Sequence, residues 1–158
     1  MVDKKLRDRP DILNYGIETS KEGLLKWEFV EEQMVSSHSY WLSTTNPNGN
    51  PHAIPVWGIW YGAKLYFGGG PKTRYRKNLE VNPNIVAHAE SGSKVVIIQG
   101  TAIVEENDDV TREIIKLYKE KYNIDHPPPF LRVDGKKILA WTMEDYTKTP
   151  TRWIITNK

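Results

Sequence analysis

The stretch YWLSTTNPNGNPHAIPVWGIWYGAKLYFG, residues 40–68, holds the pattern that decides the fold. Segments rich in aromatic, β-branched and hydroxyl residues alternate in it with short turn sequences, as strands and hairpin turns do. The pair Asn48-Gly49 supplies the positive φ that a tight hairpin needs, and Gly62-Ala63 marks a second turn. We therefore expect a meander of antiparallel hairpins, with strands over residues 39–45, 52–61 and 64–68.

The rest of the chain predicts more strands and three helices. Apolar periodicity favours helices over residues 22–36 and 107–122, and Thr73 is a suitable N-cap for a third over 74–81, which Pro83 ends. Further strands are expected over residues 84–90, 94–105, 137–146 and 152–156, an extended connector over 127–129 and an N-terminal arm over 1–20. The predicted fold is mainly β (α+β), a single domain over residues 1–158 forming a small antiparallel barrel of six to seven strands with short helices.

Composition excludes several classes of protein. The 158 residues carry 22 basic and 20 acidic side chains, and a net charge of +2 argues against a nucleic-acid partner. The absence of Cys excludes disulfides, thiolate zinc sites and a thiol nucleophile. The longest apolar stretch, residues 53–61, is far shorter than the ~20 residues that span a membrane. With no apolar signal core at the start, we expect a cytoplasmic protein without a membrane partner.

No catalytic or metal-binding motif stands out. The four histidines have no metal-ligand spacing, so no metal site is expected; they are His38, His52, His88 and His126. No G-x-S-x-G elbow is present. Acidic pairs such as Glu31-Glu32 fall in contexts typical of solvated helix surfaces. Catalytic residues therefore stay unassigned.

Residues 68–78 combine glycines with basic side chains. Gly68, Gly69 and Gly70 precede an expected helix start, where free N–H groups and the helix dipole favour an anion. Basic side chains crowd the same place, and they are Lys72, Arg74, Arg76 and Lys77. Two interpretations stay open: a cradle for a monophosphate or diphosphate, or a flexible hairpin end followed by a solvated basic helix.

The strand around Pro55 is the second unusual feature. Proline cannot donate to a β-ladder, so Pro55 belongs at an edge or beside an opening. Neighbouring backbone groups are then free to meet the polar edge of a planar ring, which Trp57 and Trp60 can wall by stacking. The alternative is an edge strand capped by aromatic core residues.

Taken together, the motifs G-x-P-H-x-x-P-V-W at 49–57 and T-R-x-x-K-N-L-x-x-N-P at 73–83 resemble the pyridoxamine 5′-phosphate oxidase-like, flavin-binding split β-barrel family. The resemblance spans roughly residues 24–106 and continues more weakly to the end. It implies an antiparallel split barrel and a homodimer with two flavin sites at the subunit interface. The implied cofactor is flavin mononucleotide, FMN.

The resemblance also implies a set of cofactor-binding residues. The isoalloxazine and ribityl parts would lie along one strand, formed by His52, Ala53, Ile54, Pro55, Val56 and Trp57. Gly68 and Gly69 match positions near the phosphate, which Arg74 and Lys77 would hold. Gln99 matches a ring contact from a neighbouring strand, and Trp153 resembles an aromatic residue supplied by the partner subunit.

The chain departs from pyridoxamine 5′-phosphate oxidases proper at two places. Its last residues, 150–158, lack a histidine, and Trp57 stands where those enzymes have a basic residue. We therefore expect an FMN-binding oxidoreductase that passes hydride through the flavin N5 to a small-molecule substrate other than a B6 vitamer. The alternatives are a reductase that uses the deazaflavin coenzyme F-420 and a non-catalytic carrier or sensor of flavin or haem.

Overall fold

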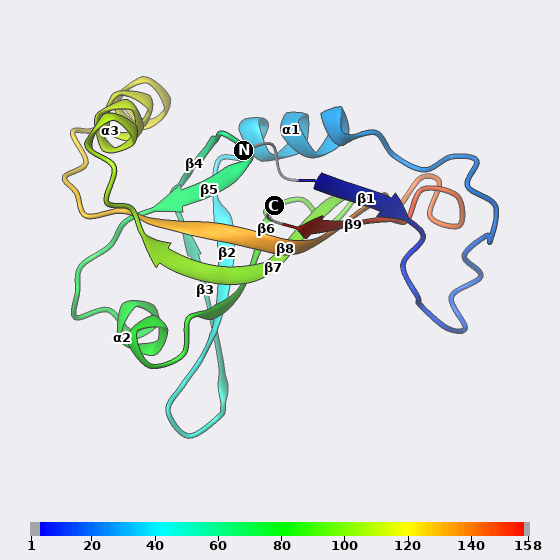
Figure 1. Ribbon diagram of the computed structural model, residues 1–158, viewed down its shortest axis with the longest axis horizontal. Helices are drawn as coiled ribbons and strands as arrows, with labels where there is room; N and C mark the ends of the chain where they lie inside the picture. Colours follow the sequence, from blue (N-terminus) through cyan, green and yellow to red (C-terminus); the bar gives the residue numbers. More distant parts are fainter. Residues whose placement is uncertain (1–3, 157–158) are drawn as a thin grey trace.

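An antiparallel sheet curved around a buried core forms the body of the molecule (Figure 1). The computed structural model describes residues 4–156. In that range the strands are β1 (Lys4–Asp8), β2 (Tyr40–Thr45), β3 (Pro51–Val56), β4 (Ile59–Tyr61), β5 (Lys64–Phe67), β6 (Asn84–Ala89), β7 (Lys94–Val104), β8 (Leu131–Thr142) and β9 (Thr151–Thr156). The helices are α1 (Trp27–Ser36), α2 (Arg74–Val81) and α3 (Asp108–Tyr122). The expected class, an antiparallel split barrel with short helices, is confirmed.

Strand order explains how the barrel is split. The main path runs β1-β9-β8-β7-β6-β2-β3, and β5 pairs with both β4 and β8. The single strand expected over residues 52–61 is therefore two strands: β3 pairs with β2, and β4 pairs with β5. Between them the backbone passes so close to its neighbours that a Cβ on Gly58 would lie 2.9 Å from the Tyr66 carbonyl oxygen. The chain changes strand partners at this glycine.

The edge position predicted for Pro55 is confirmed. Within residues 4–156, β3 pairs with β2 alone, and Pro55 lies opposite Trp41 in that ladder. Because Pro51 and Pro55 have no N–H, the strand suits the edge of a sheet. The outer edge of β3 is therefore open along its length.

The N-terminal region is more ordered than an arm. Residues 4–8 form β1, which pairs with β9 at one end of the sheet; residues 1–3 of the expected arm lie outside the described residues. The first helix begins at Trp27 instead of residue 22, and β8 begins at Leu131 instead of residue 137. Periodicity located these elements but not their boundaries, because tertiary pairing extends or shortens them.

Helices α2 and α3 begin and end where their capping residues predict. Asn107 accepts hydrogen bonds from the backbone N–H groups of Asp109 and Val110, and Asn123 ends α3 with a left-handed φ of 56°. Helix α2 stops at Val81, with Asn82 as its C-cap ahead of Pro83. These local signals act within one turn of chain, so the sequence alone predicts them.

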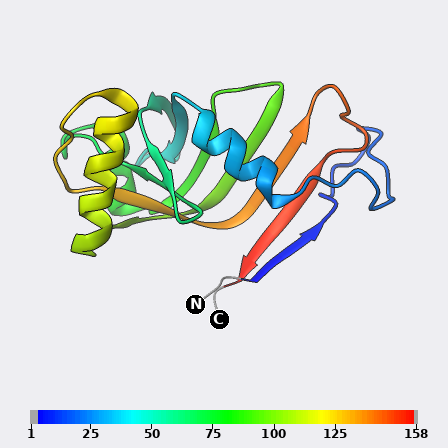
Figure 2. The ribbon, with the colours of Figure 1, turned by 90° about the horizontal axis from the view of Figure 1, so that it is seen from above.

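The core lies between α1 and the inner face of the sheet. Figure 2 shows α1 crossing that face and α3 at the end opposite β1 and β9. Inward residues such as Ile85 and Ala87 of β6 are buried, whereas the alternate residues Val86 and His88 are half-exposed on the outer face. No helix within residues 4–156 is long and apolar enough to cross a bilayer.

Candidate functional site

Helix α2 begins with unpaired positive charge. Arg74 and Lys77 are exposed, stand one turn apart, and form no ion pair within residues 4–156. Thr73 occupies the N-cap position, but its side chain makes no capping bond and donates instead to the Gly70 carbonyl oxygen at 2.8 Å. The first-turn N–H groups therefore lack a side-chain acceptor, and the helix dipole adds partial positive charge. An anion is the natural complement of this helix start.

A hollow lies between α2 and the turn that joins β2 to β3. It encloses about 450 Å³ and is lined by Arg74, His52 and residues 46–48; we call it the turn hollow. His52 lines this hollow, and its Nδ1 atom is buried without a hydrogen-bond partner among the described residues. Leaving a buried polar atom unpaired costs about 1–3 kcal/mol. A ligand that hydrogen-bonds to this nitrogen would remove that cost.

Asn78 ties α2 to the turn hollow. Its side chain is fully buried, and Nδ2 donates to Thr44 Oγ1 and to Asn46 Oδ1, both at 3.0 Å. These bonds fix the distance between the helix that carries Arg74 and the strand pair that carries His52. In the sequence, Asn78 is recognisable only as the last residue of the T-R-x-x-K-N motif. Its burial between the two elements shows the structural reason for an amide at that position.

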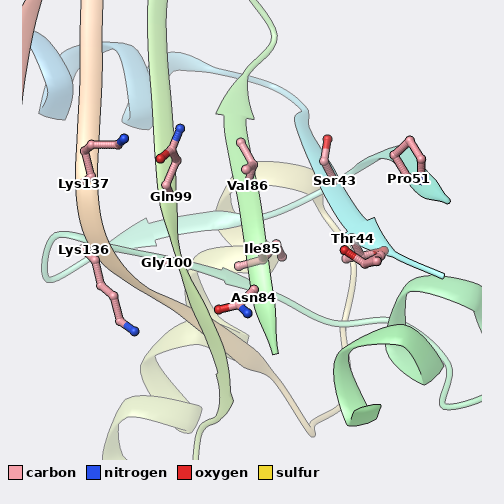
Figure 3. A pocket seen from close by; sticks show the side chains of 11 residues that line it. Ser43, Thr44, Pro51, Asn84, Ile85, Val86, Gln99, Gly100, Lys136 and Lys137 are labelled. Atoms are coloured by element: carbon pink, nitrogen blue, oxygen red, sulfur yellow. The ribbon is translucent and has the colours of Figure 1, made fainter. Parts of the chain in front are cut away.

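A second hollow opens on the outer face of the sheet, where side chains of neighbouring strands point to the same side (Figure 3). It encloses about 470 Å³, and its lining includes Ser43, Pro51, Val86, Gln99 and Lys137. Val86 lies opposite both Ser43 and Gln99, and Gln99 lies opposite Lys137. We call this the sheet hollow. It brings the expected ring contact Gln99 to the same opening as the start of β3.

A bulge in β8 lies beside the sheet hollow: Gln99 pairs with Lys137 and Gly100 with Gly135, so Lys136 is the extra residue. The register between β7 and β8 shifts at Gln99 and Gly100. A Cβ on Gly100 would lie 2.0 Å from the Asp134 carbonyl oxygen, so only glycine fits. Bulges bend a strand and re-aim its side chains. Here the bulge lies beside Gln99, at the floor of the hollow.

The expected ring-binding residues of β3 divide between its two faces. Ala53 and Pro55 are exposed, whereas Ile54 and Val56 are half-buried and pack against the core. Trp57 follows the end of the strand and is 45% exposed. An open edge with small exposed side chains can receive a flat molecule.

Gly68 and Gly69 have a packing role within the chain. A Cβ on Gly68 would lie 2.2 Å from His126 Cε1, and one on Gly69, where φ is +115°, would lie 1.7 Å from Tyr75 Oη. Tyr75 Oη donates to the Gly68 carbonyl oxygen at 2.8 Å, and burial raises the pKa of this phenol. Arg76 Nη1 donates to the Gly69 carbonyl oxygen at 3.0 Å. Both glycines thus make room for side chains of their own chain.

Two tryptophans that the sequence analysis considered for the site are buried in their own chain. Trp60 is 8% exposed and donates from Nε1 to Glu31 Oε2 at 2.6 Å. Trp153 is 2% exposed and packs edge-on against Trp27, with ring centroids 5.6 Å apart. The burial of Trp60 favours the alternative of an aromatic core residue, and the partner-subunit role implied for Trp153 stays a prediction. Strand alternation in the sequence could not tell which face of each strand is the core.

Comparison with known proteins gave a family match and similar solved structures. Residues 27–148 match the family model described as Pyridoxamine 5′-phosphate oxidase. Comparison with curated proteins gave no match. Among solved structures, a conserved hypothetical protein of Mycobacterium tuberculosis is similar at 16% identity and a TM-score of 0.64, covering 75% of this chain and 85% of that chain.

Two further structural neighbours have names that include a flavin. A pyridoxamine 5′-phosphate oxidase-related, FMN binding protein of Nostoc punctiforme has a TM-score of 0.57 at 12% identity, covering 84% of this chain and 94% of that chain. The FAD binding protein of Mycobacterium smegmatis has a TM-score of 0.54 at 15% identity, covering 84% of this chain and 98% of that chain. At these identities the likeness establishes a shared fold.

Proposed function

The chain belongs to the pyridoxamine 5′-phosphate oxidase family, and from that premise we propose that it is an oxidoreductase that binds FMN. One observation carries the proposal: Arg74 and Lys77 have no acidic partner within residues 4–156 and stand at an uncapped helix start beside a buried, partnerless His52 Nδ1. A fold that needed these charges for its own stability would pair them. They suit the phosphate of a bound cofactor.

The charge at α2 favours FMN over larger flavins. The proteins of N. punctiforme and M. smegmatis are named as FMN binding and FAD binding, which supports a flavin in general. FMN ends in one phosphate monoester, and a guanidinium with an ammonium complements a dianion of that size by charge-assisted hydrogen bonds. A single pair of exposed cations on one helix face matches this requirement.

The open edge of β3 would meet the flavin ring. Ala53 and Pro55 present little bulk there, and unpaired backbone groups of an edge strand can hydrogen-bond to the polar rim of a flat ring. Gln99 adds a side-chain amide from the sheet hollow. When bound, a flavin supplies hydride transfer through its N5. The protein's share is orientation, charge and exclusion of water.

A second copy of the chain would complete the site. A mostly apolar row of side chains crosses the outer face of the sheet: His88 lies opposite both Trp41 and Ile97, and Ile97 lies opposite Leu139. No element within residues 4–156 covers these half-exposed or exposed side chains, which suits an interface between protomers. The sheet hollow lies on the same face. We therefore expect a homodimer whose cofactor is held between the two chains.

Titration of the apoprotein with flavins tests the proposal. We expect FMN to bind at least tenfold more tightly than riboflavin, because charge-assisted hydrogen bonds to a phosphate contribute about 1.5–3 kcal/mol each. The double variant Arg74→Ala/Lys77→Ala should lose that advantage and keep its affinity for riboflavin. Flavin fluorescence quenching measures both constants, and Lys116→Ala/Lys119→Ala on the exposed side of α3 is the matched control.

Each departure from this result has a defined meaning. Equal affinity for FMN and riboflavin in the wild type would overturn the phosphate site. Tighter binding of coenzyme F-420 would overturn the choice of cofactor and favour a deazaflavin-dependent reductase. Bound flavin that nicotinamide nucleotides do not reduce, and that turns over no quinone or nitro acceptor, would favour a carrier or sensor.

A further inference from the structure

Three residues of α3 hold the break between β3 and β4. Tyr118 Oη donates to the Trp57 carbonyl oxygen at 3.0 Å. Tyr122 Oη accepts from the Gly58 N–H at 3.0 Å, and Lys121 Nζ donates to the Gly58 carbonyl oxygen at 3.2 Å. Residues 57 and 58 belong to no strand, so these side chains take the place of ladder hydrogen bonds. The backbone at Trp57 is thereby fixed from outside the sheet.

The indole of Trp57 is fixed as well. It stacks on the ring of Tyr122 with centroids 4.6 Å apart and planes 2° apart. The ring of His38 meets Trp57 edge-on at 5.9 Å and meets Tyr122 at 5.3 Å. One face of the indole is therefore covered by Tyr122, and 45% of the residue is still exposed.

The support of Tyr122 continues into the core. Lys121 Nζ donates to Tyr40 Oη at 2.8 Å and lies over the rings of Tyr40 and Tyr122, 4.8 and 5.1 Å from their centroids. Tyr40 is fully buried and donates to the Met34 carbonyl oxygen of α1 at 2.5 Å. Burial lowers the pKa of Lys121 to about 8 and raises the pKa of Tyr122 to about 12. Tyr122, on which Trp57 stacks, is thus held by contacts that reach α1 and the sheet as well as α3.

An exposed tryptophan does not need these stacking contacts and backbone hydrogen bonds in order to stay on the surface. A single exposed apolar side chain is common and is usually free to move. Trp57 instead has one face stacked, one edge packed and both adjoining peptide groups bonded. An indole with a fixed orientation and a free face is a preorganised surface for stacking, because little entropy is lost when a ring binds to it.

We propose that Trp57 is a stacking site for a planar, electron-poor aromatic ring, of the quinone or nitroaromatic class, and that Tyr122 is its positioning residue. The indole is electron-rich, so an electron-poor ring is its favoured partner. Trp57 directly follows β3, where we place the flavin ring. That the stacked ring accepts hydride from a flavin rests on the proposed function. That a ring stacks on Trp57 does not.

Fluorine NMR on protein labelled with fluorotryptophan tests the site, with menadione as the probe. The variant Trp57→Phe assigns one of the six tryptophan signals to Trp57. We expect menadione to shift that signal and to bind about two- to tenfold more weakly to Trp57→Ala, since a stacked pair contributes about 0.5–1.5 kcal/mol. Tyr122→Leu should lose severalfold in affinity, and Tyr122→Phe, which keeps the stack, should stay close to wild type.

The control is Tyr61→Leu, since Tyr61 is 40% exposed and is not among the residues that contact Trp57. FMN affinity should be unchanged in Tyr122→Phe and in Tyr61→Leu. A shift of another tryptophan, an equal loss in Tyr61→Leu, or an unaltered affinity in Trp57→Ala would overturn the site. So would conversion of Trp57→Ala to a monomer on size exclusion without loss of menadione binding, because the indole then belongs to an interface.

The two proposals fail separately. If the protein binds no flavin and menadione still shifts Trp57, the proposed function is wrong and the stacking site stands. If FMN binds and is reduced while the Trp57 signal does not respond, only the stacking site is wrong. Should Tyr122→Leu fail to fold, the pair Trp57→Ala and Tyr122→Phe still decides the outcome.

Discussion

Positive charge is used in opposite ways at the two ends of this molecule. At the β1–β9 end, Arg152 donates to both carboxylate oxygens of Asp8, at 2.8 and 2.6 Å. Its hydrogen bond to the Asp8 carboxylate lowers the pKa of that acid. At the start of α2, Arg74 and Lys77 have no acidic partner within residues 4–156. The number of basic residues says little about a ligand; whether the fold neutralises them says much more.

The same contrast extends along the sheet. Arg132 joins Asp134 at 3.1 Å and Glu105 at 3.0 Å, and Lys64 shares the same Asp134 at 2.6 Å. The guanidinium of Arg9 donates hydrogen bonds to four carbonyl oxygens, those of Ser20, Glu22, Lys148 and Pro150. These bonds link the N-terminal segment to the loop before β9. These cations hold segments together. Arg74 and Lys77 of α2, by contrast, form no ion pair with any described residue.

The largest expected effect on stability comes from Arg132. Its substitution, Arg132→Met, leaves Glu105, whose side chain is 7% exposed, without its cation. Loss of one partner of a buried pair costs about 3 kcal/mol. Urea denaturation should show this loss, while Arg112→Met in the exposed pair with Asp109 should cost less than about 0.5 kcal/mol. A loss below about 1 kcal/mol for Arg132→Met would mean that Arg132 does not stabilise the fold by its ion pairs.

Arg9→Ala should be the next largest. We expect about 2 kcal/mol of lost stability, because charge-assisted hydrogen bonds to carbonyl groups disappear at a partly exposed site. Arg9→Lys should recover less than half of that loss, since an ammonium lacks the planar fork that reaches several acceptors. Thermal unfolding measures the stability, and limited proteolysis within residues 9–23 reports the freed segment. Equal stability of the two variants would contradict the role of the fork.

Lys121 tests a third situation, a cation held by hydroxyl, carbonyl and ring partners without an acid in direct contact. Because burial lowers its pKa from 10.5 to about 8, the unfolded chain binds more protons between those values, and the free energy of unfolding should rise with pH across that window. After allowance for its half-exposed position, the rise should be about 1 kcal/mol.

The matched measurement compares the wild type with Lys121→Met from about pH 7 to about pH 9.5, below the raised pKa of Tyr122. Relative to the wild type, the variant should become less stable as pH rises. Parallel curves for the two proteins would show that Lys121 has an ordinary pKa in the fold.

The smallest expected change in stability belongs to Arg74→Ala/Lys77→Ala. Unfolding free energy should stay within about 0.5 kcal/mol of wild type, with a slight gain because cations at a helix N-terminus are unfavourable. The same variant is expected to lose FMN affinity, so stability and binding separate. A fall of more than about 1 kcal/mol would mean that the fold itself uses these charges, and the contrast with Arg132 would disappear.

Prediction from sequence succeeded where the signal is local. The bounds of α2 and the end of α3 follow from Asn82-Pro83 and Asn123, which act within one turn. Pro55 marked β3 as an edge strand because a missing N–H has the same consequence in any sheet. Arg74 and His52, expected in one site, do line the same hollow.

Prediction stopped where a residue depends on distant partners. Tyr118, Lys121 and Tyr122 read as one face and end of a helix, and only the packed chain brings them to Trp57 and Gly58, some sixty residues earlier. The sequence left Trp60 open between a ring wall and a core residue, because a tryptophan in a strand looks the same whether it faces the core or a ligand; its burial favours the core. The strand β1 was missed because its partner β9 lies at the other end of the chain.

By itself, the sequence determined the kinds of elements, the edge character of β3 and the gathering of basic residues at the start of α2, since these depend on residues close together in the chain. The tertiary structure decided which cations stay unpaired, which aromatic rings are buried and what holds Trp57 in place. Those properties depend on how far apart two side chains are once the chain has closed around its core, and no spacing along the sequence records that distance.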